Sequence, residues 1–200
     1  MTEQRAHVVD IGSVEPITWG DETGRWLLLG EDTGGLYSFF EVTTPPGSGP
    51  PLHIHQEMDE SFYVVEGEYE FQLGDDFHKV GPGSMVYGPR GLRHAFVNSG
   101  DRPGRMLCVV APGGIESWFR ELGQLLAEQR PPDWDRMQEL ADRHRITGFR
   151  PKGGPSRRPG EAFGDGPVGP PVVGRPGGGP GGPGGAPGTG RPAGGNPGRG

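Results

Sequence analysis

The chain has 200 residues, enough for one domain with sequence to spare, because single hydrophobic cores usually form from roughly 100–150 residues. Residues 1–150 contain 13 Lys and Arg against 24 Asp and Glu, whereas residues 151–200 contain 6 against 2. An acidic body argues against a nucleic-acid partner, and no stretch approaches the roughly 18 apolar residues of a membrane span. With a single cysteine and no apolar leader, we predict a cytoplasmic protein with no membrane association.

Short runs rich in Val, Tyr, Phe and Leu recur between residues 25 and 111. The expected strands are "RWLLLG", "LYSFFEVT", "SFYVVEG", "YEFQL", "FHKV", "SMVYG", "RHAFVN" and "RMLCVVA". Glycine, proline and aspartate separate them, as at "TTPPGSGPP" and "VGPGS", and leave little room for helices. This pattern predicts an all-β body, a sandwich or barrel of antiparallel strands.

Beyond residue 114 the spacing of apolar residues changes from the strand period to the helical period of about 3.6. One helical face would carry Ile115, Trp118, Phe119, Leu122, Leu125 and Leu126. That helix should end near Arg130, before two prolines, and a weaker second helix should follow with Asp133 as its N-cap. We interpret both apolar faces as packing surfaces that close one end of the β-body, rather than as parts of a cofactor site.

Glycine and proline are concentrated at the end of the chain. Residues 151–200 contain 20 of the 40 glycines and 12 of the 23 prolines. Such a segment cannot bury enough apolar surface to offset its ordering entropy, so we expect it to be disordered. The predicted organisation is therefore one domain over residues 1–150 and a tail over residues 151–200.

Two histidines and a glutamate form the first candidate site. On a β-strand, residues i and i+2 face the same side, so His53 and His55 can converge on one ion. Glu60 follows at the start of a strongly β run, where an inward carboxylate would be costly unless it were paired or bound to metal. The alternative is that these are ordinary solvated residues of a strand, which a lone His-X-His does not exclude.

Two motifs at fixed spacing resemble those of the cupins, which are small jelly-roll β-barrels. The first motif is formed by Gly47, His53, His55, Glu60 and Gly67. The second motif is formed by Gly83, Pro89, Gly91, His94 and Asn98. The surrounding stretches look most like single-domain bacterial cupins of the quercetin 2,3-dioxygenase type, in which a helical segment follows the barrel.

The resemblance implies that His53, His55, Glu60 and His94 hold one divalent transition metal ion. Imidazole and carboxylate ligands suit Fe, Mn, Ni, Co, Cu or Zn, and four protein ligands leave positions open on a six-coordinate ion. The alternative is a cupin whose ion is absent or only structural. By strand parity, Phe62, Val64 and Phe96 should line a substrate pocket around the ion, although core packing would explain the same three residues.

By analogy with that family we expect a dioxygenase for an aromatic, flavonol-like or polyketide-like small molecule, with Glu60 acting as both ligand and catalytic base. Cupins also include other activities, so two alternatives stay open. One is a metal-dependent isomerase or cyclase that acts on a sugar or a polyketide. The other is a non-catalytic module that binds a small molecule. The resemblance further implies a homodimer.

Overall fold

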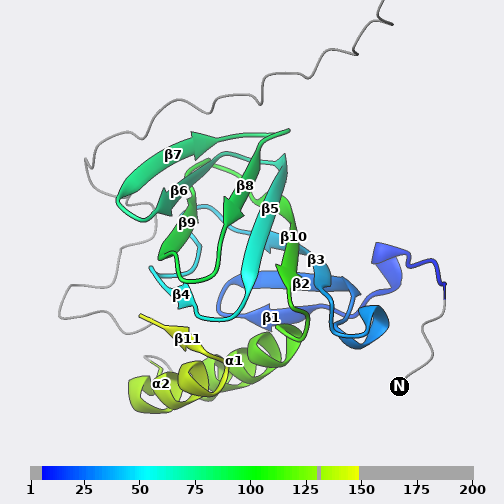
Figure 1. Cartoon of the computed structure of the whole chain (residues 1–200). Coiled ribbons are helices and arrows are strands. Elements are labelled where there is room, and N and C mark those ends of the chain that lie inside the picture. Colours follow the sequence, from blue (N-terminus) through cyan, green and yellow to red (C-terminus); the bar gives the residue numbers. More distant parts are fainter. Residues whose placement is uncertain (1–5, 130–131, 149–200) are drawn as a thin grey trace, which may run out of the picture.

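The computed structural model describes residues 6–129 and 132–148 as two facing sheets, a small third sheet and two helices (Figure 1). The six-stranded sheet runs in the order β1 (Ile17–Trp19), β2 (Glu22–Leu28), β3 (Ser38–Thr44), β10 (Gly104–Ala111), β5 (Asp59–Glu66) and β8 (Met85–Gly88). The three-stranded sheet consists of β7 (Asp76–Val80), β6 (Tyr69–Leu73) and β9 (His94–Asn98), and the two-stranded sheet of β11 (Ile146–Thr147) and β4 (Ile54–His55). Short 3₁₀ helices, η1 (Ile11–Ser13) and η2 (Glu31–Thr33), precede β1 and β3. The predicted all-β jelly roll is confirmed.

Alternation of side chains explains why the central strands take this arrangement. Along β3 and β10 every second residue is buried, as expected for strands with one face on the core. The antiparallel register places Cys108 of β10 between Phe40 of β3 and Phe62 of β5. From the opposite sheet, the rings of Phe71 and Phe96 approach Phe62 to centroid distances of 5.2 and 5.5 Å. The core therefore lies between the two larger sheets.

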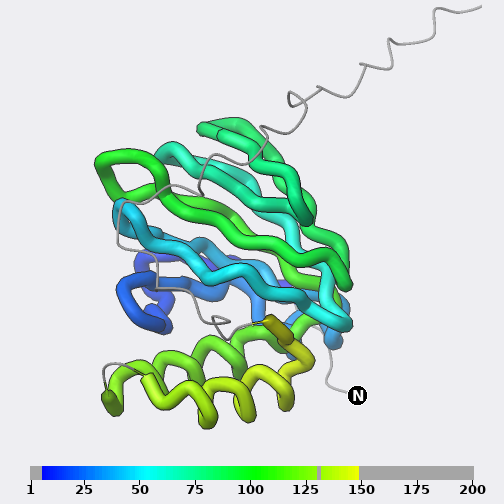
Figure 2. The backbone as a smooth tube through the Cα atoms, turned by 90° about the vertical axis from the view of Figure 1, so that its left-hand side faces the viewer, coloured from blue at the N-terminus to red at the C-terminus, as the bar shows by residue number. Residues whose placement is uncertain are grey.

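Two helices, α1 (Glu116–Glu128) and α2 (Trp134–Arg143), lie side by side beneath the barrel (Figure 2). Their order and the N-cap at Asp133, which accepts hydrogen bonds from two backbone N–H groups, confirm the sequence prediction. Helix α1 lies against β1 so closely that a Cβ atom at Gly123 would come within 2.2 Å of the Thr18 carbonyl oxygen. Phe119 of α1 also contacts β1, because the centroid of its ring lies 4.2 Å from that of the Trp19 ring.

Two short strands, β1 and β11, were not predicted. The strand expected at His53 and His55 is present but contains only two residues, Ile54–His55 (β4). Strand β11 pairs with β4, so that Ile146 lies opposite His55, and Ile146 is fully buried. Within the described residues, no helix combines the length and the apolar character that crossing a bilayer requires. The tail predicted at residues 151–200 lies outside the described residues.

Candidate metal centre

The four predicted ligands come from three separate strands and one adjoining residue. His55 lies on β4, Glu60 on β5 and His94 on β9. His53 forms an antiparallel bridge with His94: each backbone N–H donates to the other residue's carbonyl oxygen, at 3.0 and 2.8 Å. This bridge joins the segment before β4 to β9 of the three-stranded sheet, and it places the imidazoles of His53 and His94 at one point of the barrel wall.

The structure brings the four side chains into one buried cluster. One donor atom from each residue lies within 4.8 Å of all the others. Nε2 of His53 is 3.1 Å from Nε2 of His55, and Oε2 of Glu60 is 3.2 Å from Nε2 of His55 and 3.3 Å from Nε2 of His94. All four residues are buried, with His94 only 1% exposed.

Backbone carbonyls fix the protonation of two of the imidazoles. Nδ1 of His53 lies 2.8 Å from the Pro51 carbonyl oxygen, and Nδ1 of His94 lies 3.0 Å from the Leu92 carbonyl oxygen. A carbonyl can only accept a hydrogen bond, so each Nδ1 carries the proton and donates it. Nε2 of the neutral ring is then left with a lone pair that faces the cluster, which is the arrangement that metal-bound histidines use.

Burial and mutual charge determine the protonation of the cluster. Desolvation, together with the neighbouring imidazoles, lowers the pKa of His53 to about 3, so this ring is neutral at physiological pH. Burial alone would raise the pKa of Glu60, but hydrogen bonds from His55 and His94 outweigh it and hold that pKa below its usual range. Burial opposes a charge on His94 too, yet the contact with Glu60 raises its pKa. His53 is therefore a neutral imidazole and Glu60 a carboxylate, whereas the contact with Glu60 favours a proton on His94 when no metal ion is bound.

These residues fit a divalent transition metal ion. Nε2 of His94 and Oε2 of Glu60 are both acceptors when the ring is neutral, so their 3.3 Å approach favours a shared cation or proton. Among the described residues, buried Nδ1 of His55 has no hydrogen-bond partner, so its only polar contacts are made by Nε2, which lies 3.2 Å from Oε2 of Glu60 and 3.1 Å from Nε2 of His53. Three nitrogens and one oxygen form a donor set typical of Fe, Mn, Co, Ni, Cu or Zn.

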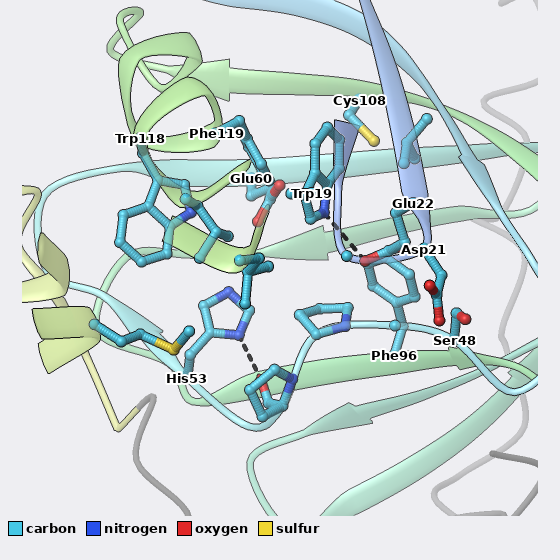
Figure 3. Close-up of a pocket in the computed structure, with 18 of the residues that line it drawn as sticks. Trp19, Asp21, Glu22, Ser48, His53, Glu60, Phe96, Cys108, Trp118 and Phe119 are labelled. Carbon is cyan, nitrogen blue, oxygen red and sulfur yellow. Dashed lines mark hydrogen bonds between the residues drawn. The ribbon is translucent and has the colours of Figure 1, made fainter. Parts of the chain in front are cut away.

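A cavity of about 290 Å³ extends from this cluster (Figure 3). His53, His55 and Glu60 line it, and so do Phe62 and Phe96, two of the three expected pocket residues. Val64, the third, is fully buried and does not line the cavity. It shares the strand face of Glu60 but lies four residues further along β5, about 13 Å away, where side chains fill the barrel. Our placement of Val64 in the pocket wall is therefore corrected.

The far wall of the cavity comes from segments that we had not connected with the site. Trp19 and Glu22, from β1 and β2, line it, as do Trp118, Phe119 and Leu122 of α1. We interpreted the helical stripe as packing alone, whereas it also encloses the cavity. A Gly-Asp pair between Trp19 and Glu22 is a turn signal that could have predicted the hairpin, but nothing in the sequence shows that this hairpin faces the cluster.

A family model described as "Cupin domain" matches residues 40–110, which include all four ligand candidates. Polyketide synthase CurC of Streptomyces cyaneus is 33% identical over 115 residues, 56% of this chain and 73% of that protein. The chain belongs to the cupin superfamily. This cupin is also 25% identical to quercetin 2,3-dioxygenase of Bacillus subtilis over 117 residues, 58% of this chain but only 34% of that enzyme.

Solved structures give the same fold. A crystal structure described as a predicted oxalate decarboxylase from Thermotoga maritima matches with a TM-score of 0.51 and 24% identity, over 53% of this chain and 99% of that one. At this level of identity the likeness concerns the fold of the cupin body and not its activity.

Proposed function

We propose that this cupin is a metal-dependent enzyme that acts on an aromatic polyketide or a related polyphenol, and that it closes or rearranges a ring by proton transfer. The observation that carries the proposal is the joining of a buried three-histidine, one-glutamate cluster to a cavity walled by tryptophan and phenylalanine rings. Such walls suit a flat aromatic substrate, and the likeness to polyketide synthase CurC supports the same substrate class.

The residues of the cluster would divide the work of binding and proton transfer. His53, His55, His94 and Glu60 would hold the ion, which when bound supplies a Lewis acid that favours the enolate or phenolate form of a substrate oxygen. Glu60 uses Oε2 for both of its histidine contacts, so Oε1 remains to accept a proton from the carbon between two substrate carbonyls. The aromatic walls exclude water from the enolate that forms.

A second candidate is a dioxygenase for a flavonol-like substrate, which the similarity to quercetin 2,3-dioxygenase of Bacillus subtilis favours. The same cluster would serve, because binding of a deprotonated phenol is common to both reactions. The CurC match covers 73% of that protein, whereas the dioxygenase match covers 34%, so we rank a polyketide substrate above a flavonol.

The experiment that tests the proposal compares turnover with and without oxygen. The protein is loaded separately with Zn²⁺, Fe²⁺, Mn²⁺, Co²⁺ or Ni²⁺ and incubated with a poly-β-ketone or a flavonol under air and under argon. Ring closure predicts a cyclic product that is isomeric with the substrate, or that product less one water, formed equally in both atmospheres. A dioxygenase predicts oxygen uptake and a product that contains both atoms of O₂.

The matched control is Glu60→Gln, which keeps the size of the side chain and removes the base. Because Glu60 is also a ligand candidate, loss of turnover in this variant supports catalysis by Glu60 when both metal content and substrate binding are retained. If no metal-loaded form converts either substrate, and binding survives Glu60→Gln, the cupin is a binding module and the proposed enzyme function is wrong. The expected homodimer remains a prediction that light scattering can check.

A further inference from the structure

Glu22 is a second buried carboxyl group in the wall of the cavity, outside the ligand cluster. It begins β2, directly after the hairpin turn that follows Trp19, and the residue is 7% exposed. Oε2 accepts a hydrogen bond from the Trp19 indole N–H at 3.2 Å, and Oε1 accepts one from the Thr44 hydroxyl at 3.1 Å (Figure 3 shows the first). Both donors are neutral.

No cation of the described residues pairs with this carboxyl group. Glu22 forms no ion pair there, and the titratable groups that interact with it are acids: Asp21 in its own turn, Glu60 on β5, Cys108 on β10 and Tyr69 on β6. The imidazoles of His53 and His55 line the same cavity. Burial raises the pKa of both Cys108 and Tyr69, so these two groups remain neutral. A buried carboxylate without a positive partner is costly, and nearby Asp21 and Glu60 increase that cost.

The cost of the charge favours the protonated acid. Desolvation, with a smaller contribution from the charges of Asp21 and Glu60, raises the pKa of Glu22 to about 7 despite its two hydrogen bonds. The indole N–H is a donor only, so Oε2 must act as the acceptor and the proton resides on Oε1. When Oε1 carries the proton, it can donate a hydrogen bond to the Thr44 hydroxyl oxygen, or to another acceptor that replaces Thr44.

We propose that Glu22, in its protonated form, is a second acid in the cavity wall and donates its proton to a substrate oxygen. The inference rests on the proposed function, which supplies a substrate whose oxygens become more basic during the reaction. It adds to that proposal a group that is neither a metal ligand nor part of the recognised motifs. The alternative is a purely structural role, in which the hydrogen bond from Trp19 to Glu22 only stabilises the β1–β2 hairpin.

The proton balance of the reaction has a place for this acid. Glu60 takes a proton from the substrate carbon, the carbanion forms a C–C bond to a second carbonyl, and the electron pair of that C=O bond moves to its oxygen. The O–H bond of Glu22 breaks as its proton passes to this oxygen, which leaves an alcohol and a carboxylate. Glu60 then releases the proton that it took and Glu22 regains one through water, so no oxidant or reductant is needed.

The experiment detects the proton on the Glu22 carboxyl group directly, and it measures how that proton changes the affinity for a bound probe. Wild type is compared with Glu22→Gln, and with Glu68→Gln as the matched control at an exposed position between β5 and β6. Infrared difference spectra of Zn²⁺-loaded protein at about pH 6 report the C=O band of a protonated carboxylic acid. Metal-free samples are recorded too, because a cation in the cluster lowers the pKa of a nearby carboxyl group.

Quercetin is the probe, and its binding to the Zn²⁺-loaded proteins is followed by absorption. The expected result is a protonated-carboxyl band that Glu68→Gln retains and Glu22→Gln lacks, and that shifts when quercetin binds. The wild-type affinity relative to Glu22→Gln should fall about tenfold between about pH 6 and pH 8, as Glu22 loses its proton. Zinc content should stay the same in all three proteins.

Three outcomes would overturn the inference. These are the absence of the band from zinc-loaded wild type, a band that quercetin leaves unmoved although it binds, and an affinity ratio that is independent of pH. If wild type lacks the protonated-carboxyl band and Glu22→Gln loses zinc or its fold, Glu22 has the structural role in the hairpin instead. Failure of wild type to bind quercetin would count against the proposed function, and the band of the free protein would then decide whether Glu22 carries the proton.

Discussion

The orientation of two of the three imidazoles in the cluster is decided by atoms outside it. The carbonyl oxygens of Pro51 and Leu92 accept hydrogen bonds from Nδ1 of His53 and His94, which turns the Nε2 atom of His53 toward His55 and that of His94 toward Glu60. Because these carbonyls belong to the backbone, no side-chain substitution can remove them directly. The ligand set is therefore preorganised by the chain path as much as by the identity of the four residues.

His94→Ala should abolish stable metal binding. It removes one of three nitrogen donors and leaves Oε2 of Glu60 without one of its two partners. We expect affinity to fall by more than the roughly 10–100-fold that loss of a ligand's hydrogen-bonding partner costs. Elemental analysis of protein purified without added metal, and competition with a chromophoric chelator, measure the loss.

His78→Ala is the matched control for that variant. His78 lies on β7, outside the cluster, so its loss should leave metal content unchanged. Equal metal content in His94→Ala, His78→Ala and wild type would contradict the assignment of His94 as a ligand.

Glu22 should make the stability of the metal-free protein depend on pH. Its pKa is about 7 in the fold and about 4.5 when the carboxyl group is unperturbed. A raised pKa stabilises the fold below the unfolded value, and this contribution is lost as the pH rises through the folded value. Relative to Glu22→Gln, the free energy of unfolding of wild type should therefore fall by on the order of 3 kcal/mol between about pH 4.5 and pH 7. Urea unfolding across this range measures it, and a constant difference would contradict the assignment.

At the level of strands and helices, what could be predicted depended on the length of the element. The long strands and both helices have enough residues to show a period, and the ligand motifs have fixed spacing, so both were found from the sequence. Strands β4 and β11 have two residues each, too few for any period. Strand parity placed Phe62 and Phe96 correctly but could not tell that Val64 lies beyond the end of the cavity.

Because α1 lies so close to β1, we expect a glycine-to-alanine change in this helix to destabilise the protein, which is opposite to the effect that helix propensity predicts. Alanine is usually better than glycine inside a helix, by about 1 kcal/mol. At Gly123, however, a Cβ atom would meet the Thr18 carbonyl oxygen at 2.2 Å, so the helix would have to move away from β1. We expect Gly123→Ala to destabilise the protein by about 1–3 kcal/mol and to weaken binding of an aromatic probe, because α1 lines the cavity.

Ala127→Gly serves as the matched control on the exposed side of α1. Here propensity alone acts, so the change to glycine should cost about 1 kcal/mol and leave probe binding intact. Urea unfolding of both variants gives the two values. A stabilised Gly123→Ala protein would show that α1 does not depend on this close contact.

Considered as a whole, the described part of the molecule connects residues 116–147 to the candidate metal site at two places. Helix α1 supplies part of the cavity wall, and β11 pairs with the strand that carries His55. Sequence periodicity could not show either role, because an apolar helix face has the same pattern whether it meets core residues or a cavity. Glu22 was missed for a related reason: it becomes part of the site only when the β1–β2 hairpin folds over the barrel, 38 positions before Glu60 in the chain.

Two truncations should separate the contribution of β11 from that of the glycine- and proline-rich segment. Ending the chain after residue 150 keeps β11, so we expect the melting temperature and metal content of the full chain. Ending it after Arg143 removes Ile146 from the core, together with the ladder that pairs it with His55 and the Gln56 N–H bond to the Arg145 carbonyl. Loss of a buried isoleucine costs about 2–5 kcal/mol, and β4 loses its partner strand, so melting temperature and metal affinity should both fall. Calorimetry and chelator competition on the three chain lengths measure the effect. Equal affinity in all three would mean that the bridge between His53 and His94 is sufficient to position the ligands without β11.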